Sequence, residues 1–444
     1  MNDHIMKIEI VSNESIRPSS PTPDKFNTHI LSRFDQIFPP YYVSLLLYYL
    51  NLDSNSSSLG NDEKDKNIIF SESSRHRCDV LKKSLAETLT RYYPLAGRIK
   101  DEKSVDCNDK GVDYIEARVV GRVLSQVMQL ASSDIGVIQP FLAFDEPYGE
   151  TGSNSKALLK IQVNVFDGGG MVISLIYCHR ILDGSSFINF VKDWAAISRS
   201  GSSTHGDELK VAAVDKPCYV LSSMFPPTTC MSFGEQEKNT RVNQIVAKRT
   251  ELMTKRFVFK NSSIAKLMEK CIHDLNANKG SDCQVDNEEE NMHQLPTRFE
   301  ALTALIWMCF MDVDHHFKVK QIEDGVTPIN AVSTPKQVQN ITNNVINLRS
   351  KMIPPLLANS FGNMTDVAIA EVSRCLTGRN LTNNGNGFHD QISQYYQELV
   401  SKIKNSIKSV DNEHMKALQG NKFAISCNRL KIHQGFGEGH TCNV

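Results

Sequence analysis

The chain has 444 residues, 22% of which are charged, and 49 basic residues nearly balance 50 acidic ones. Without a long basic run, this charge balance argues against a nucleic-acid-binding protein. The first residues contain no apolar signal-peptide core, and the longest apolar runs, residues 41–50 and 301–311, are too short to cross a bilayer. We therefore expect a cytoplasmic protein, not bound to a membrane, of two or three domains.

The eleven cysteines are scattered, with no Cys-x-x-Cys pair and no grouping with histidine. In a chain without a secretory signal this pattern predicts free thiols and no metal site.

In the first half, apolar residues at helical spacing predict a helix over residues 78–93 that ends near Tyr93 and Pro94. Residues 157–165 alternate between apolar and polar through their second half, and three glycines separate them from the apolar run 171–178. This pattern predicts two neighbouring strands with a tight connection. Phe187, Phe190 and Trp194 then recur at helical spacing after Gly184.

In the second half, a Ser/Gly-rich and Pro-containing stretch indicates a crossover between two domains. We expect an N-terminal domain over residues 1–200, a linker over 201–235 and a C-terminal domain over 236–444. In the C-terminal domain we expect a strand at 255–259 and a helix at 262–272 capped by Asn261 or Ser262. A buried helix at 298–311 and an amphipathic helix at 391–410 should follow.

His179 is predicted to lie at the end of the second strand, four residues before Asp183. Imidazole titrates nearest to neutral pH, so a histidine at this position is a candidate general base, and an enzyme is the first hypothesis. However, a chain with thirteen histidines should contain about one His-x-x-x-Asp pair by chance. Cys178 should point to the opposite face of the strand, which disfavours a thiol nucleophile.

An ordered series of segments resembles the BAHD family of plant coenzyme A-dependent acyltransferases. Residues 179–184 resemble its central motif, and the helix from Phe190 to Trp194 resembles the one that follows it. The other similar segments are residues 20–23, 31–36, 93–98 and 105–117 in the first half, and 297–307, 347–349, 354–355 and 361–363 in the second. Within the family, the chain is most similar to the members that acetylate alkaloid alcohols.

The resemblance implies a mixed α/β fold of the chloramphenicol-acetyltransferase type, with two domains and a tunnel at their interface. It also implies a monomer with no permanently bound cofactor, which uses acetyl-CoA as co-substrate and a small-molecule alcohol as acceptor. His179 would be the catalytic base that takes the proton of the alcohol as it attacks the thioester.

For other motif residues the resemblance implies structural roles. Asp183 is expected to form an ion pair with Arg298 rather than a triad with His179, and Gly184 to allow the turn from strand to helix. Asn347, Arg349 and Asn363 are expected to hold loops of the second domain. Because coenzyme A carries phosphates, cations and hydroxyls near a helix N-terminus are candidate contacts: Lys255, Arg256, Ser262, Ser263 and Lys266.

The C-terminus departs from the family pattern. Where members carry an Asp-Phe-Gly-Trp-Gly motif, this chain has Gly435-Phe-Gly-Glu-Gly439, and it ends at Val444. We therefore expect a truncated C-terminal domain. Besides an active O-acyltransferase, two alternatives stay open: an inactive truncated homologue that only binds ligand, and a different reaction on the same scaffold.

Overall fold

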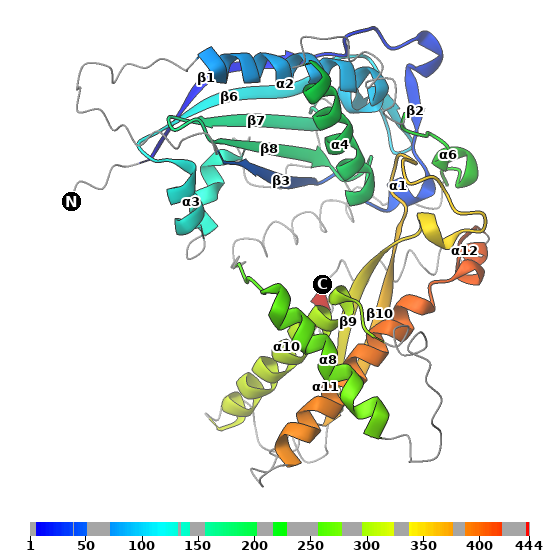
Figure 1. Cartoon of the computed structure of the whole chain (residues 1–444). Coiled ribbons are helices and arrows are strands. Elements are labelled where there is room, and N and C mark those ends of the chain that lie inside the picture. The colour runs from blue at the N-terminus through cyan, green and yellow to red at the C-terminus, as the bar shows by residue number, and fades with distance from the viewer. Residues whose placement is uncertain are drawn as a thin grey trace, which may run out of the picture. The chain divides into compact units, whose positions relative to one another are not determined.

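A computed structural model describes residues 6–38, 40–50, 72–131, 135–142, 156–201, 216–228, 256–277, 295–323, 337–375, 387–419 and 441–443. The chain divides into two compact units, each described by itself: Met1–Arg256 with Leu356–Met364, and Phe257–Pro355 with Thr365–Val444 (Figure 1). The predicted linker lies largely outside the described residues, and the predicted domain boundaries stay a prediction. The assignment of Leu356–Met364 to the first unit was not indicated by the sequence.

The first unit is built on a five-stranded sheet. Its strands, in spatial order, are β1 (Lys7–Ile16), β6 (Val112–Val120), β7 (Leu159–Phe166), β8 (Met171–Cys178) and β3 (Tyr42–Tyr49). β6 and β7 run parallel, while all other neighbours are antiparallel, so the sheet is mixed. The predicted pair of strands joined through glycines is confirmed as β7 and β8, and the mixed α/β class is confirmed with it.

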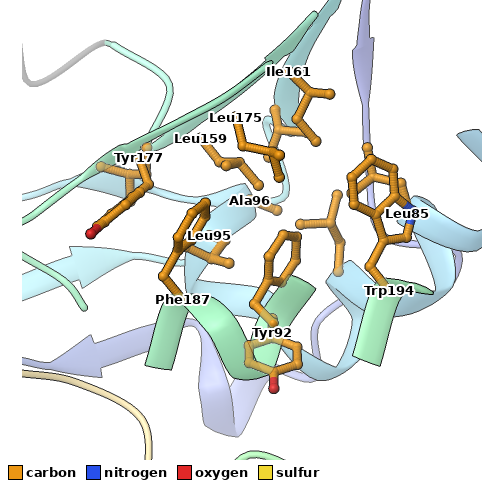
Figure 2. Close-up of a cluster of buried hydrophobic side chains, with 14 of the residues drawn as sticks. Leu85, Tyr92, Leu95, Ala96, Leu159, Ile161, Leu175, Tyr177, Phe187 and Trp194 are labelled. Atoms are coloured by element: carbon orange, nitrogen blue, oxygen red, sulfur yellow. The ribbon is translucent and has the colours of Figure 1, made fainter. Parts of the chain in front are cut away.

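Helices cover both faces of this sheet. α2 (Glu72–Arg91) and α4 (Gly184–Gly201) pack over one face, and Figure 2 shows the apolar cluster between them and the strands. α3 (Leu124–Leu130) and the 3-10 helix Ile135–Phe141 cover the other face. A strand buried on both faces needs apolar residues at nearly every position, which explains the apolar run of β8, in which Ser174 is the one hydroxyl from Met171 to Ile176.

α2 and α4 are locked to each other by a buried tryptophan. The Trp194 Nε1–H donates to the Leu81 carbonyl and to Ser84 Oγ, both at 3.1 Å. The Ser84 and Ser198 hydroxyls also lie 2.6 Å apart. α2 begins earlier than predicted, at Glu72, and ends at Arg91, just before the expected stop at Pro94.

A smaller part of the first unit supports the site described below. It consists of the three-stranded sheet β2 (Thr28–Ile30), β5 (Ser104–Asp106) and β4 (Arg98–Ile99), with the short helices α1 (Arg33–Ile37) and α6 (Leu221–Met224). Ser32 caps α1, and Asp35 completes a reciprocal capping box.

The second unit packs helices on a small sheet. β9 (Gln337–Asn347) pairs antiparallel with β10 (Thr365–Cys375) and parallel with β11 (Thr441–Asn443). The helices are α8 (Asn261–Ala277), α10 (Arg298–Glu323), α11 (Gly387–Lys408) and α12 (Asn412–Gln419). Tyr395, Leu399, Ile403 and Ile407 of α11 face the core, which confirms the predicted amphipathic helix.

Some predictions for the second half were wrong. Residues 256–260 form no strand, and the Phe257 and Val258 side chains are 75% and 73% exposed, so neither packs as a strand residue would. α8 begins at Asn261, which places that residue within the helix rather than before it. α10 is longer than expected and buries one side, with Trp307 in the core and Phe310 exposed. The altered motif at 435–439 lies outside the described residues.

Within the described part of the chain, no helix is both long enough and apolar enough to cross a membrane.

The packing of α2 makes a testable prediction about stability. Leu85 is fully buried in the cluster below α2 and α4, whereas Leu130 at the end of α3 is 37% exposed. Leu85→Ala should lower the free energy of unfolding of the first unit by about 2–5 kcal/mol, because it leaves a cavity. Leu130→Ala, the matched control, should change it by about 0.5 kcal/mol or less. Urea unfolding followed by far-UV circular dichroism measures both, and equal effects would contradict the described core.

Candidate active site

His179 begins the turn that follows β8. Its backbone N–H donates to the Tyr41 carbonyl at 2.9 Å, and the preceding Cys178 N–H donates to the Leu158 carbonyl at 2.9 Å. These bonds tie the end of β8 to the chain on both sides. His179 therefore lies at a fixed position where the sheet ends, as the sequence predicted.

Aromatic rings surround the imidazole of His179. The Phe38 ring stacks on it with the ring centroids 4.4 Å apart, and the Tyr41 ring lies at 5.1 Å. Burial lowers the pKa of His179 below its ordinary value, although its own carbonyl and the charge of Asp183 oppose this shift. The imidazole is therefore largely neutral at neutral pH, which is the form that can accept a proton.

The two ring nitrogens of His179 differ in their surroundings. Nδ1 is buried and has no hydrogen-bond partner among the described residues. The same does not hold for Nε2. Nε2 is therefore the nitrogen that a substrate in this unit could reach. Because Nδ1 is unpaired, no carboxylate in the described part of the chain completes a triad with His179.

Hydrogen bonds from Asn363 hold the turn after β8. Its amide Nδ2 donates to the His179 carbonyl at 2.9 Å and to the Arg180 carbonyl at 3.2 Å. The same nitrogen also lies 2.9 Å from Asp35 Oδ1. Asn363 was predicted to hold a loop of the second domain, but it holds the turn of the candidate base in the first unit.

The partner of Asn363, the Asp35 carboxylate, accepts four hydrogen bonds. Oδ2 accepts from the Ser32 N–H and hydroxyl, both at 2.7 Å, and Oδ1 accepts from the Asn363 N–H at 2.6 Å besides its amide. Burial raises the pKa of Asp35 to about 6, and these hydrogen bonds oppose the rise. The group is therefore mainly ionised at neutral pH, as an acceptor of four bonds must be.

Asp183 caps α4 and also binds the segment Leu356–Met364, which contains Asn363 and is called the returning segment below. Its Oδ1 accepts from the Ser186 N–H at 2.9 Å and its Oδ2 from the Met364 N–H at 3.0 Å. A carboxylate that accepts from the third residue of a helix is an N-cap. These bonds agree with the predicted structural role of Asp183. The predicted ion pair with Arg298, an exposed residue at the start of α10, would join the two units and stays a prediction.

The sequence suggested that Gly184 needs the backbone freedom of glycine, but the structure assigns this requirement to Gly362. Gly184, the first residue of α4, is not left-handed, and an added Cβ would meet no atom within 4 Å. It therefore needs no special backbone freedom. Gly362 has a φ of +125°, and a Cβ there would lie 2.9 Å from Leu221 Cδ1 and 3.4 Å from Asp35 Oδ1. The conformational requirement thus falls on Gly362, which brings the returning segment against Asp35.

Cys178 and Arg180, which flank His179, are both buried. Burial raises the pKa of the Cys178 thiol to about 11, so the thiolate is scarce at neutral pH. Arg180 Nη2 lies 3.4 Å from the Glu102 carbonyl. Arg180 was not predicted, and no local pattern distinguishes it from a surface arginine.

The predicted coenzyme A contacts are exposed where they are described. Ser262, Ser263 and Lys266 lie in the first two turns of α8, and Arg256 precedes that helix. Lys255 lies outside the described residues. Their role stays a prediction.

Known proteins resemble this chain over most of its length. Limonoid 1-O-acetyltransferase of Citrus sinensis is 30% identical over 403 residues, which cover 90% of this chain and 77% of the relative. Salutaridinol 7-O-acetyltransferase of Papaver somniferum is 28% identical, with 98% of this chain and 81% of the relative covered.

The fold has a counterpart among solved structures. Vinorine synthase superposes with a TM-score of 0.61 at 23% identity, with 98% of this chain and 83% of that chain covered. The family model described as the Transferase family matches residues 6–434. The chain therefore belongs to this family, the BAHD acyltransferases, as the ordered motifs had predicted.

Proposed function

We propose that the chain transfers an acetyl group from acetyl-CoA to a hydroxyl of a plant specialised metabolite, with His179 as the general base. The relatives that carry this proposal are O-acetyltransferases of limonoids and of salutaridinol. The acceptor class is accordingly a bulky terpenoid or alkaloid alcohol. A cytoplasmic location and a monomeric state remain predictions from the sequence.

The observation that carries the proposal is an imidazole held at a fixed turn among aromatic rings. An alcohol is a weak nucleophile at neutral pH, so its proton must be taken as the new bond forms. His179 Nε2 accepts this proton while the alcohol oxygen bonds to the thioester carbonyl carbon. The carbon–sulfur bond then breaks, and the coenzyme A thiolate leaves with a proton from the imidazolium or from water. No acyl-enzyme is needed.

The surroundings of His179 suit this role. The neutral form needs an environment that disfavours charge, and the Phe38 and Tyr41 rings supply it. Asn363 fixes the backbone that carries the imidazole, which limits misplacement of the base. Asp183 contributes by shaping the start of α4 rather than by relaying a proton.

For the donor, we propose that the α8 N-terminus with Ser262, Ser263 and Lys266 contacts phosphates of coenzyme A, with Arg256 and Lys255 nearby in sequence. Free N–H groups and cations at a helix start favour anions. The alternative that the chain is an inactive homologue that only binds ligand is decided by the first experiment below.

The base role predicts a large effect of removing the imidazole. Thiol release from acetyl-CoA should depend on a limonoid or alkaloid alcohol, and His179→Ala should lower kcat by about 10²–10⁴-fold. His316→Ala, an exposed histidine on α10, is the control and should retain full activity. Release that His179→Ala leaves intact would refute the base role. No release by the folded wild-type chain would favour the inactive homologue.

The lowered pKa of His179 predicts the pH profile. Activity requires the neutral imidazole, so kcat/KM should fall as the pH decreases through the pKa of His179. Because burial lowers that pKa, the midpoint of the acid limb should lie below the ordinary histidine value of about 6.5. A limonoid alcohol without a titratable amine should serve as acceptor. A midpoint above 6.5 would contradict the described environment of His179.

The hydrogen bonds of Asn363 predict that it positions the base. Asn363→Ala leaves two carbonyls and the Asp35 carboxylate short of a donor, and should destabilise the first unit by roughly 2–4 kcal/mol. The folded fraction of this variant should have a lower kcat, and the midpoint of the acid limb of its pH–rate profile should differ from that of the wild-type chain. Asn359→Ala on the same segment, which removes one bond to the Lys216 carbonyl, is the control and should cost about 1 kcal/mol.

Urea unfolding and pH–rate profiles distinguish the two variants. Equal effects of both substitutions would refute a positioning role for Asn363.

A further inference from the structure

The first unit contains a cavity of about 420 Å³ at the end of the sheet remote from His179. β8 contributes Met171 and Ile173 from its beginning, whereas His179 follows its other end. His179 lies six residue positions after Ile173 along the chain, a span of roughly 20 Å in an extended strand. Leu175 and Tyr177 fill the space between as part of the buried cluster. In Figure 2, Tyr177 and Trp194 lie at opposite ends of that cluster. The cavity is therefore separate from the candidate active site.

The walls of the cavity are mostly apolar. Leu47 of β3 and Ile173 of β8 are cross-strand partners on the sheet side. Trp194 of α4 and Leu81 of α2 line the helix side. The hydrogen bonds of Trp194 Nε1 to α2 fix the indole ring, so this wall is preformed. A concave, preformed apolar site of this size is typical of a small-molecule pocket.

Among the described residues that line the cavity, the ionisable side chains are basic. They are His76 and Arg77 of α2 and Arg199 of α4, and none of the described lining residues is an aspartate or glutamate. Arg77 is half-buried, and among the described residues its guanidinium donates to neutral acceptors, the Gly169 carbonyl at 3.2 Å and Ser74 Oγ at 3.3 Å. Its Nε is buried without a partner among the described residues. A half-buried guanidinium with a buried, unused donor favours a carboxylate or a similar anion.

We propose that this cavity binds a small organic anion with an apolar body, such as a medium-chain carboxylic acid. The apolar body packs between Ile173 and Trp194, and the anionic group binds the guanidinium of Arg77. The site does not depend on the acyl transfer proposed above, since no lining residue belongs to the turn of His179.

The first test is a titration of the full chain with decanoate, measured by isothermal calorimetry below the concentration at which decanoate forms micelles. We expect one decanoate per chain. Decanol and decyltrimethylammonium, which have the same apolar body without the negative charge, should bind at least about tenfold more weakly. Equal affinity for the three compounds would overturn the proposal, because it would indicate non-specific partition onto apolar surface.

Variants locate the site. Arg77→Gln should weaken decanoate binding about tenfold, because it removes the charge-assisted contact. Arg75→Gln, the same change two residues away on α2 at an exposed residue outside the cavity, should leave the affinity within about twofold. Ala195→Phe, which fills the cavity from α4, should abolish binding, with circular dichroism reporting whether the chain is folded.

The outcome is independent of catalysis. His179→Ala should bind decanoate like the wild-type chain, so loss of transferase activity does not affect this test. No decanoate binding by the folded wild-type chain, or binding that neither Arg77→Gln nor Ala195→Phe weakens, overturns the proposal.

Discussion

The hydrogen bonds between the Asp35 carboxylate and Asn363 are the constraint on which the candidate site depends. They join the start of α1 to the returning segment Leu356–Met364, and the same asparagine amide reaches the carbonyls of His179 and Arg180. All these groups are buried or nearly so, and an unmet buried acceptor is costly. Removing one member would therefore loosen the turn that carries the imidazole. Gly362 permits the arrangement, because a side chain there would collide with its neighbours.

The two motif residues, His179 and Asp183, have different roles. His179 lies among aromatic rings, and burial lowers its pKa, which favours the neutral form that the proposed base requires. Asp183 is instead committed to backbone N–H groups of α4 and of the returning segment. One motif thus supplies a reactive group and the cap that starts the next helix. The spacing of four residues reflects the length of the turn between β8 and α4.

The double burial of β8 connects the fold to both proposals. Because helices cover both faces of the sheet, β8 is buried along its whole length. His179 follows one end, and the apolar cavity with Arg77 lies at the other. Buried core residues, including Leu175 and Tyr177, lie between the two sites. Two separate sites on one unit are compatible with this arrangement, since these core residues lie between them.

The sequence by itself determined the β7–β8 pair, the helix after Gly184 and the apolar face of α11, because side-chain periodicity is a local property. It also placed His179 at a strand end and, through motif order, identified the family. Tertiary structure alone decided that Leu356–Met364 belongs to the first unit, that Asn363 holds the His179 turn and that Gly362 rather than Gly184 needs glycine. The bond between Asn363 and Asp35 spans 328 residues, and such a contact leaves no periodic trace in the residues around either partner. Local patterns encode which face of an element is buried, whereas the partners of a buried polar group depend on how distant segments meet.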